Sequence, residues 1–173
     1  STGLKTGAGA KPVLGSPEHA PQISVADLMA EIESGEVGVI DLGYSRDYRR
    51  GHIPGARFLI RSRLETDKAN LPLAALYVVT SEDGLAAAVA AEELSAALGA
   101  PVKALEGGTA AWATAGLPME EGETHMASEP TDVWLKPYER KGSVEDFMNE
   151  YLTWEIALVD QIKKDDTVTF WSP

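Results

Sequence analysis

The hydrophobic positions between residues 24 and 35 recur at the spacing of an α-helix. The apolar face consists of Val25, Leu28, Met29 and Ile32. Ser24 lies three residues before Asp27, an arrangement in which two side chains cap the first turn of a helix, and Gly35 follows the last apolar position. The pattern therefore predicts a short helix over residues 25 to 34.

Three short apolar runs have the length and the β-branched content of buried strands: residues 37 to 42, 76 to 80 and 102 to 105. An alanine-rich helix is predicted over residues 85 to 98, closed by Gly99, and a smaller helix over residues 108 to 115. Strands that alternate with helices indicate an open parallel sheet of about five strands with helices on both faces. We expect the strand of residues 76 to 80 to lie centrally, with residues 81 to 86 as a loop at its carboxyl end.

The two ends of the chain lack this alternation. Residues 1 to 22 are rich in glycine and proline and predict a linker, and residues 119 to 142 turn acidic and irregular. Ser143, three residues before Asp146, then opens a long amphipathic helix. Its apolar stripe consists of Val144, Phe147, Met148, Tyr151, Leu152, Leu158, Val159 and Ile162. We expect this stripe to be buried, either on the domain itself or on a neighbouring domain or subunit.

Charge and composition narrow the possible partners and chemistry. The chain has 15 basic and 27 acidic side chains, a net charge of −12, which argues against binding to nucleic acids or anionic membranes. No run approaches the roughly 20 apolar residues that a membrane span needs, so we expect a soluble protein. The chain has no cysteine, which excludes disulfides, thiolate metal sites and persulfides. No metal-ligand spacing or nucleotide-binding motif predicts a cofactor.

Three stretches resemble the rhodanese family in the order in which that family has them. Asp41 ends the first predicted strand, and residues 46 to 56 are similar to the family's EYxxGHIPGA signature. Residues 76 to 98 occupy the place of the active-site loop, and residues 105 to 118 resemble the family's LEGGxxAWxxAGLP. The resemblance covers residues 23 to 118 and implies a rhodanese-like sheet. Residues 1 to 22 are then a leader, and residues 119 to 173 are an acidic linker with a helical extension.

The loop departs from the family at the positions that carry chemistry. Active members read Cys-x-x-Gly-x-Arg, in which the cysteine accepts sulfur as a persulfide. The corresponding residues here are Ser81, Glu82, Asp83, Gly84, Leu85 and Ala86. Gly84 matches, but Ser81 stands at the cysteine position and Ala86 at the arginine position. A hydroxyl oxygen cannot store sulfur as a persulfide, and the two carboxylates would repel an anionic donor such as thiosulfate.

Other roles for these residues are weaker. Ser81 lies on a strand-to-helix turn, but no Gly-x-Ser-x-Gly elbow surrounds it and no histidine is evidently available as a base. Asp83 is expected to cap the following helix. His52 is expected to be a structural hydrogen-bonding residue, and Trp112 to be a core anchor. The remaining histidines, His19 and His125, lie in irregular segments.

Two functions remain open. The first is a catalytically silent rhodanese-like domain that serves as a docking or scaffolding module of a larger multi-domain protein. The second is the non-nucleophilic domain of a thiosulfate sulfurtransferase whose active cysteine lies in another domain. The expected partner is a protein or a neighbouring rhodanese-like domain, and a homo-oligomer is also open. The resemblance implies a cytoplasmic protein.

Overall fold

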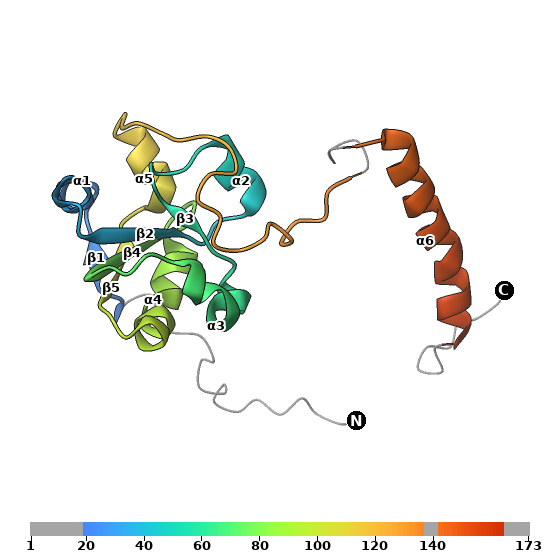
Figure 1. Ribbon diagram of the computed structural model, residues 1–173, viewed down its shortest axis with the longest axis horizontal. Helices are drawn as coiled ribbons and strands as arrows, with labels where there is room; N and C mark the ends of the chain where they lie inside the picture. Colours follow the sequence, from blue (N-terminus) through green and yellow to red (C-terminus); the bar gives the residue numbers. More distant parts are fainter. Residues whose placement is uncertain (1–18, 137–141, 165–173) are drawn as a thin grey trace, which may run out of the picture. The chain divides into compact units, whose positions relative to one another are not determined.

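The computed structural model describes residues 19–136 and 142–164 of the chain (Figure 1). The chain divides into two compact units, and the boundary lies between Val133 and Trp134. The first unit contains the sheet, and the second contains the long helix α6 (Val144–Lys164). Most of the predicted leader, residues 1 to 22, falls outside the described residues.

Five strands form one parallel sheet in the order β1-β5-β4-β2-β3. They are β1 (Gln22–Ile23), β2 (Val37–Asp41), β3 (Arg57–Phe58), β4 (Leu76–Thr80) and β5 (Val102–Leu105). The predicted parallel α/β fold is confirmed, and β4 occupies the central place expected for residues 76 to 80. The strands β1 and β3 were not predicted, because two residues are too few to show a periodic pattern.

The principal helices of the first unit are α1 (Val25–Ser34), α2 (Ser45–Arg50), α4 (Leu85–Leu98) and α5 (Gly108–Thr114). A short helix, α3 (Leu64–Asp67), lies between the 3₁₀ turns η2 (Arg61–Arg63) and η3 (Lys68–Asn70). The predictions for α1 and α4 are confirmed to the residue. The Ser24 hydroxyl accepts a hydrogen bond from the Asp27 amide at 3.1 Å, as the capping pattern indicated.

Alternate residues of the central strand feed two separate cores. Tyr77 and Val79 pack with the buried alanines of α4, whose small side chains let that helix approach the sheet closely. Val78 points to the other face, where it packs with Leu28 of α1 and Trp112 of α5. Figure 1 shows α3 and α4 on one side of the sheet and α1 and α5 on the other. The prediction of helices on both faces of the sheet is therefore confirmed.

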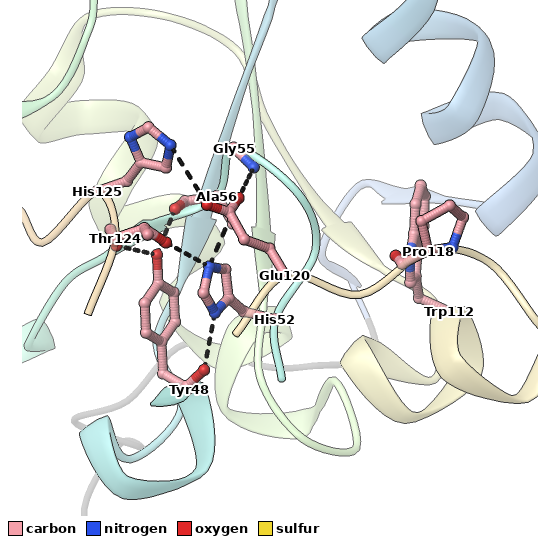
Figure 2. A network of polar contacts seen from close by, with 9 residues as sticks. All are labelled: Tyr48, His52, Gly55, Ala56, Trp112, Pro118, Glu120, Thr124 and His125. Carbon is pink, nitrogen blue, oxygen red and sulfur yellow. Dashed lines mark hydrogen bonds and ion pairs between the residues drawn. The ribbon is translucent and has the colours of Figure 1, made fainter. Parts of the chain in front are cut away.

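The first unit extends beyond residue 118, where the sequence resemblance ended. His52 and Glu120 exchange two backbone hydrogen bonds of 2.9 Å, and the Tyr48 hydroxyl donates to the Thr124 carbonyl at 2.7 Å (Figure 2). Met126 forms a parallel bridge with Phe58. Residues 119 to 133 therefore pack on the domain, and the predicted linker begins too early. The backbone of this acidic segment, which has no apolar periodicity, forms hydrogen bonds with backbone groups of the domain without forming a long strand.

The helix α6 begins at Val144 as predicted. The Ser143 hydroxyl accepts a hydrogen bond from the Asp146 amide at 3.2 Å, which caps the first turn. The apolar residues of the predicted stripe are largely exposed, among them Met148, Leu152 and Val159. None of the described helices has the length and apolar character needed to cross a membrane.

Candidate functional site

The loop that replaces the family's active-site loop lies at the carboxyl end of β4. Ser81 directly follows that strand, and Leu85 begins α4. Asp41, the last residue of β2, is paired in register with Thr80, the last residue of β4. The carboxyl ends of both strands therefore lie at the same edge of the sheet. They line a cavity of about 840 Å³ whose other walls come from α2 and α5.

The backbone of this loop is held by the first turn of α5. The Thr109 amide donates to the Ser81 carbonyl at 2.9 Å, and the Ala110 amide donates to the Glu82 carbonyl at 2.9 Å. These bonds satisfy amides that a helix leaves without an internal partner. The loop and α5 are therefore fixed to each other through main-chain groups, independently of the loop's side chains.

Two glycines make this close approach possible. Gly84 has a φ of +80°, and a Cβ there would lie 2.8 Å from the Leu105 carbonyl oxygen. Gly108 has a φ of +63°, and a Cβ there would collide with the Ser81 carbonyl oxygen. Gly84 is also the one loop position that matches the family's pattern. It is explained by backbone geometry and needs no role in chemistry.

The Ser81 side chain faces inward and is only 4% exposed. Its hydroxyl oxygen accepts a long hydrogen bond, 3.3 Å, from the Ala87 amide in the first turn of α4. The position expected for a nucleophile is therefore occupied by a buried hydroxyl. No histidine lies among the described residues that line the cavity, so the structure offers this hydroxyl no imidazole base there.

Asp83 was predicted to be the N-cap of α4, but it lies one residue before the N-cap. The residue that caps α4 is Gly84, and no side chain makes the capping bond from that position. The Asp83 carboxylate instead accepts a hydrogen bond from the Leu85 amide at 3.0 Å. The expected N-cap position was wrong because Gly84 supplies the left-handed turn into the helix. The expected stabilisation of the helix start by this carboxylate is present.

Acidic groups dominate the polar lining of the cavity. The carboxylates are Asp41, Asp47, Glu82 and Asp83, and the one basic residue in the described lining is Arg50. The Arg50 guanidinium lies 2.9 Å from the Asp47 carboxylate, so its charge is already compensated. Ala86 lines the cavity at the place where the family has arginine. An anionic sulfur donor or a phosphate group would therefore meet repulsion and no unpaired cation.

Asp41 is the buried acid of this site, and sequence reasoning noted it only as the end of a strand. Burial raises its pKa from 3.8 to about 6, although hydrogen bonds from the Gly43 amide and the Thr109 hydroxyl act in the opposite direction. The Thr109 and Thr80 hydroxyl oxygens lie 3.0 Å apart. Because these residues are far apart in sequence, no local pattern could have indicated that Thr80, Thr109 and Asp41 form one cluster.

His52 has the structural role that was predicted, together with partners that were not. Its ring is fully buried and stacks on Tyr48, with 3.6 Å between the ring centroids (Figure 2). One ring nitrogen lies 2.7 Å from the Tyr48 carbonyl oxygen, and the other lies 3.0 Å from the Thr124 hydroxyl. Because a carbonyl only accepts, the first nitrogen donates its N–H. His52 thus ties α2 to the segment after α5.

The two remaining histidines lie elsewhere. His125 is 3.7 Å from the Glu120 carboxylate, and His19 borders a separate cavity beside α4 and β5. The Trp112 indole donates to the Pro118 carbonyl at 2.9 Å and is buried, as the prediction of a core anchor required. Within residues 19–136 and 142–164, no group of three or more histidine, aspartate and glutamate side chains could hold a metal ion.

The sheet order, the loop after its central strand and the α5 contact define the class of protein. The sequence model of the rhodanese-like domain family matches residues 24–115, which is more than half of the chain. The chain therefore belongs to the rhodanese-like domain family. It is a member without cysteine.

Known proteins that are similar to this chain include three with 30% identity or more. The structure of thiosulfate sulfurtransferase from Pseudomonas aeruginosa has 38% identity and a TM-score of 0.79, over 88% of this chain and 29% of that one. An HTH-type transcriptional regulator of Mycobacterium tuberculosis is 36% identical over 118 residues, which are 64% of this chain and 48% of that protein. A Rhodopseudomonas palustris protein described as a possible tyrosine phosphatase has 30% identity and a TM-score of 0.50, over 60% and 86%.

The extent of these similarities differs. The chain spans about half of the Mycobacterium regulator and less than a third of the Pseudomonas structure. The first unit ends at residue 133 of 173, so a match over 88% of the chain reaches into the second unit. The similarity to the Pseudomonas protein is therefore not confined to the rhodanese-like domain.

Proposed function

We propose that this chain is a catalytically silent rhodanese-like domain that acts as a docking or scaffolding module within a larger, multi-domain, cytoplasmic protein. The observation that carries the proposal is the loop after β4. Its main chain is held by α5, while the cysteine position is a buried serine and the arginine position is Ala86. The loop keeps the frame of an active site without a sulfur acceptor or a cation for the donor.

The first test measures thiocyanate formed from thiosulfate and cyanide. The unmodified chain should give no product above a protein-free control, because it contains no thiol. Ser81→Cys should react with a maleimide yet transfer little sulfur, since Glu82 and Asp83 still repel the donor and Ala86 cannot hold it. Adding Ala86→Arg to Ser81→Cys should raise transfer. Ser62→Cys, an exposed position outside the cavity, is the matched control for a thiol placed elsewhere.

The results of this assay show whether the fold of the loop is enough for sulfur transfer or whether its side chains are also needed. Turnover by the unmodified chain would overturn the proposal outright. Turnover by Ser81→Cys alone at the level of the double variant would contradict the role assigned to the missing arginine. A Ser62→Cys protein that transfers as much sulfur as the double variant of Ser81→Cys and Ala86→Arg would mean that the cavity contributes nothing to sulfur transfer.

A second candidate is the non-nucleophilic domain of a thiosulfate sulfurtransferase. It is favoured by the similarity to the Pseudomonas protein, which extends over 88% of this chain yet covers 29% of that one. In this candidate another domain supplies the cysteine, and the present domain contributes an interface to it. The test is the thiosulfate assay on the full-length gene product. Activity that is lost when a cysteine outside the present sequence becomes serine supports this candidate, and inactivity of the full-length product rejects it.

A further inference from the structure

The cavity at Ser81 has the size and the position of a ligand site. Its volume of about 840 Å³ lies within the range of about 300 to 1,000 Å³ that is typical of ligand pockets. It borders the carboxyl ends of β2 and β4, and open parallel sheets bind their ligands beyond these ends. The charge and the shape of its lining therefore decide which ligand fits.

Three of the four carboxylates in this lining have no cation beside them. The Asp47 carboxylate is compensated by the Arg50 guanidinium, 2.9 Å away. In contrast, no basic side chain in the described part of the chain forms an ion pair with Asp41, Glu82 or Asp83. The cavity therefore has an excess of negative charge, which favours a cationic ligand.

Asp41 is the residue in this group that points to a ligand. Its side chain lines the cavity, yet the residue is only 4% exposed. Its Oδ1 accepts a hydrogen bond from the Gly43 amide at 2.7 Å, whereas the Thr109 hydroxyl lies 3.5 Å from Oδ2. An ionised carboxylate can accept about four hydrogen bonds, and a buried charge needs a partner. A cationic donor that enters through the cavity would supply both.

The other walls of the cavity suit an arginine side chain. No group of three or more histidine, aspartate and glutamate side chains among residues 19–136 and 142–164 could hold a metal ion, so the carboxylates favour an organic cation. Leu42, Ala113 and Met119 offer apolar surface for an aliphatic stem. Tyr44 is 63% exposed and offers an aromatic ring to a planar cation. A guanidinium is more weakly hydrated than an ammonium, so it enters a partly apolar cavity at a lower cost.

We propose that the cavity at Ser81 binds an arginine side chain of a protein partner, with the guanidinium against the Asp41 carboxylate and with Glu82 and Asp83 at the entrance. This inference rests on the docking function proposed above and names the chemistry of the partner. Ala86, which stands in the place of the family's arginine, leaves the cavity without a cation that would compete with the partner's side chain.

The first experiment titrates the full, ¹⁵N-labelled chain with a peptide of one arginine flanked by glycines and blocked at both ends. The pH is kept above the pKa of Asp41, about 6, and the salt at about 0.15 M, which screens weak surface attraction. The largest changes in chemical shift should occur at the amides of Gly43, Ser81 and Thr109. The same peptide with citrulline, which has a similar shape but no charge, should bind about tenfold more weakly.

Charge variants then test whether the cavity is the site. Glu82→Gln combined with Asp83→Asn should weaken binding of the arginine peptide about fivefold to tenfold. Glu33→Gln combined with Glu36→Gln is the matched control, because it removes the same charge from exposed positions outside the cavity. It should weaken binding less than about twofold, since distant surface charges are screened. Asp41→Asn should also weaken binding while the chain stays folded.

The opposite results overturn the inference. An equal loss in the control variant would mean that the peptide responds only to the net charge of the chain. A lysine peptide that binds as tightly would contradict the role of the guanidinium, and methylguanidinium that binds as tightly would assign the cavity to a small free cation. Preference for a glutamate peptide would leave a docking module with a partner of the opposite charge. The absence of shifts with every probe would reject this cavity as the docking site, while the thiocyanate assay still decides catalytic silence separately.

Discussion

The turn around His52 and the loop around Ser81 are two motifs of the same domain. The turn keeps the side chains of the family's motif, and the loop has lost the side chains that the family uses for sulfur transfer. Around His52, the residues that match the family are joined by stacking and by short hydrogen bonds to Tyr48 and Thr124. Around Ser81, the backbone frame is intact, but the side chains that sulfur transfer requires are absent. The backbone frame of the site and its chemistry therefore depend on different residues.

This separation predicts that a backbone change beside the loop will disturb the protein more than any change to the loop's own polar side chains. Gly108→Ala should have the largest effect. It forces a Cβ into the Ser81 carbonyl oxygen and adds the strain of a left-handed conformation. We expect a loss of about 4 kcal/mol in the free energy of unfolding, measured by urea titration.

Gly99→Ala is the control for this change. Gly99 has nearly the same φ, +65° against +63°, but no atom lies within 4 Å of the place where its Cβ would be. It should therefore cost only the conformational strain, about 1 kcal/mol. Equal losses for the two variants would show that the contact between the loop and α5 is not what makes Gly108 necessary.

His52→Ala tests the turn around His52. The change removes a fully buried ring, leaves the Tyr48 carbonyl without its donor and opens a space beside the Tyr48 ring. The expected loss is about 3 kcal/mol, read from the urea midpoint at constant slope. His125→Ala, at a partly exposed histidine that also faces Glu120, should cost less than about 1 kcal/mol. A larger effect for His125 would reverse the assignment of the structural histidine.

The sequence predicted what depends on local pattern and missed what depends on distant contacts. The helices α1 and α4 and the central strand β4 were predicted to the residue, because apolar periodicity and glycine ends mark them. The packing of residues 119 to 133 on the domain was missed, since the pairing of His52 with Glu120 joins segments without periodicity. The cluster of Asp41, Thr80 and Thr109 was missed for the same reason, as three separate elements bring it together.

The buried Asp41 carboxyl makes the stability of the site around Ser81 depend on pH. Its pKa is raised from 3.8 to about 6, so between these values the folded state holds a proton that the unfolded state has released. Stability from this group is therefore fully present below about pH 4 and is lost as the pH rises through 6. The loss corresponds to about 2 to 3 kcal/mol.

Asp41→Asn should remove this dependence, because the amide keeps an oxygen for the Gly43 amide and carries no charge. The measurement is the free energy of unfolding at several pH values between 4 and 7, for the variant and for the unmodified chain. The difference between the two proteins should grow with pH in favour of the variant. A difference that is constant over this range would contradict the raised pKa.

The smallest effect on the free energy of unfolding is expected at Ser81, where the family has its cysteine. Ser81→Ala removes one hydroxyl whose hydrogen bond to the Ala87 amide is long, 3.3 Å, while the main-chain bonds from Thr109 and Ala110 to the loop stay in place. The expected loss is about 0.5 to 1 kcal/mol, measured by urea titration beside Gly108→Ala. If Ser81→Ala destabilised the chain as strongly as Gly108→Ala, the serine would be part of the frame, and the separation of frame from chemistry would not hold at this loop.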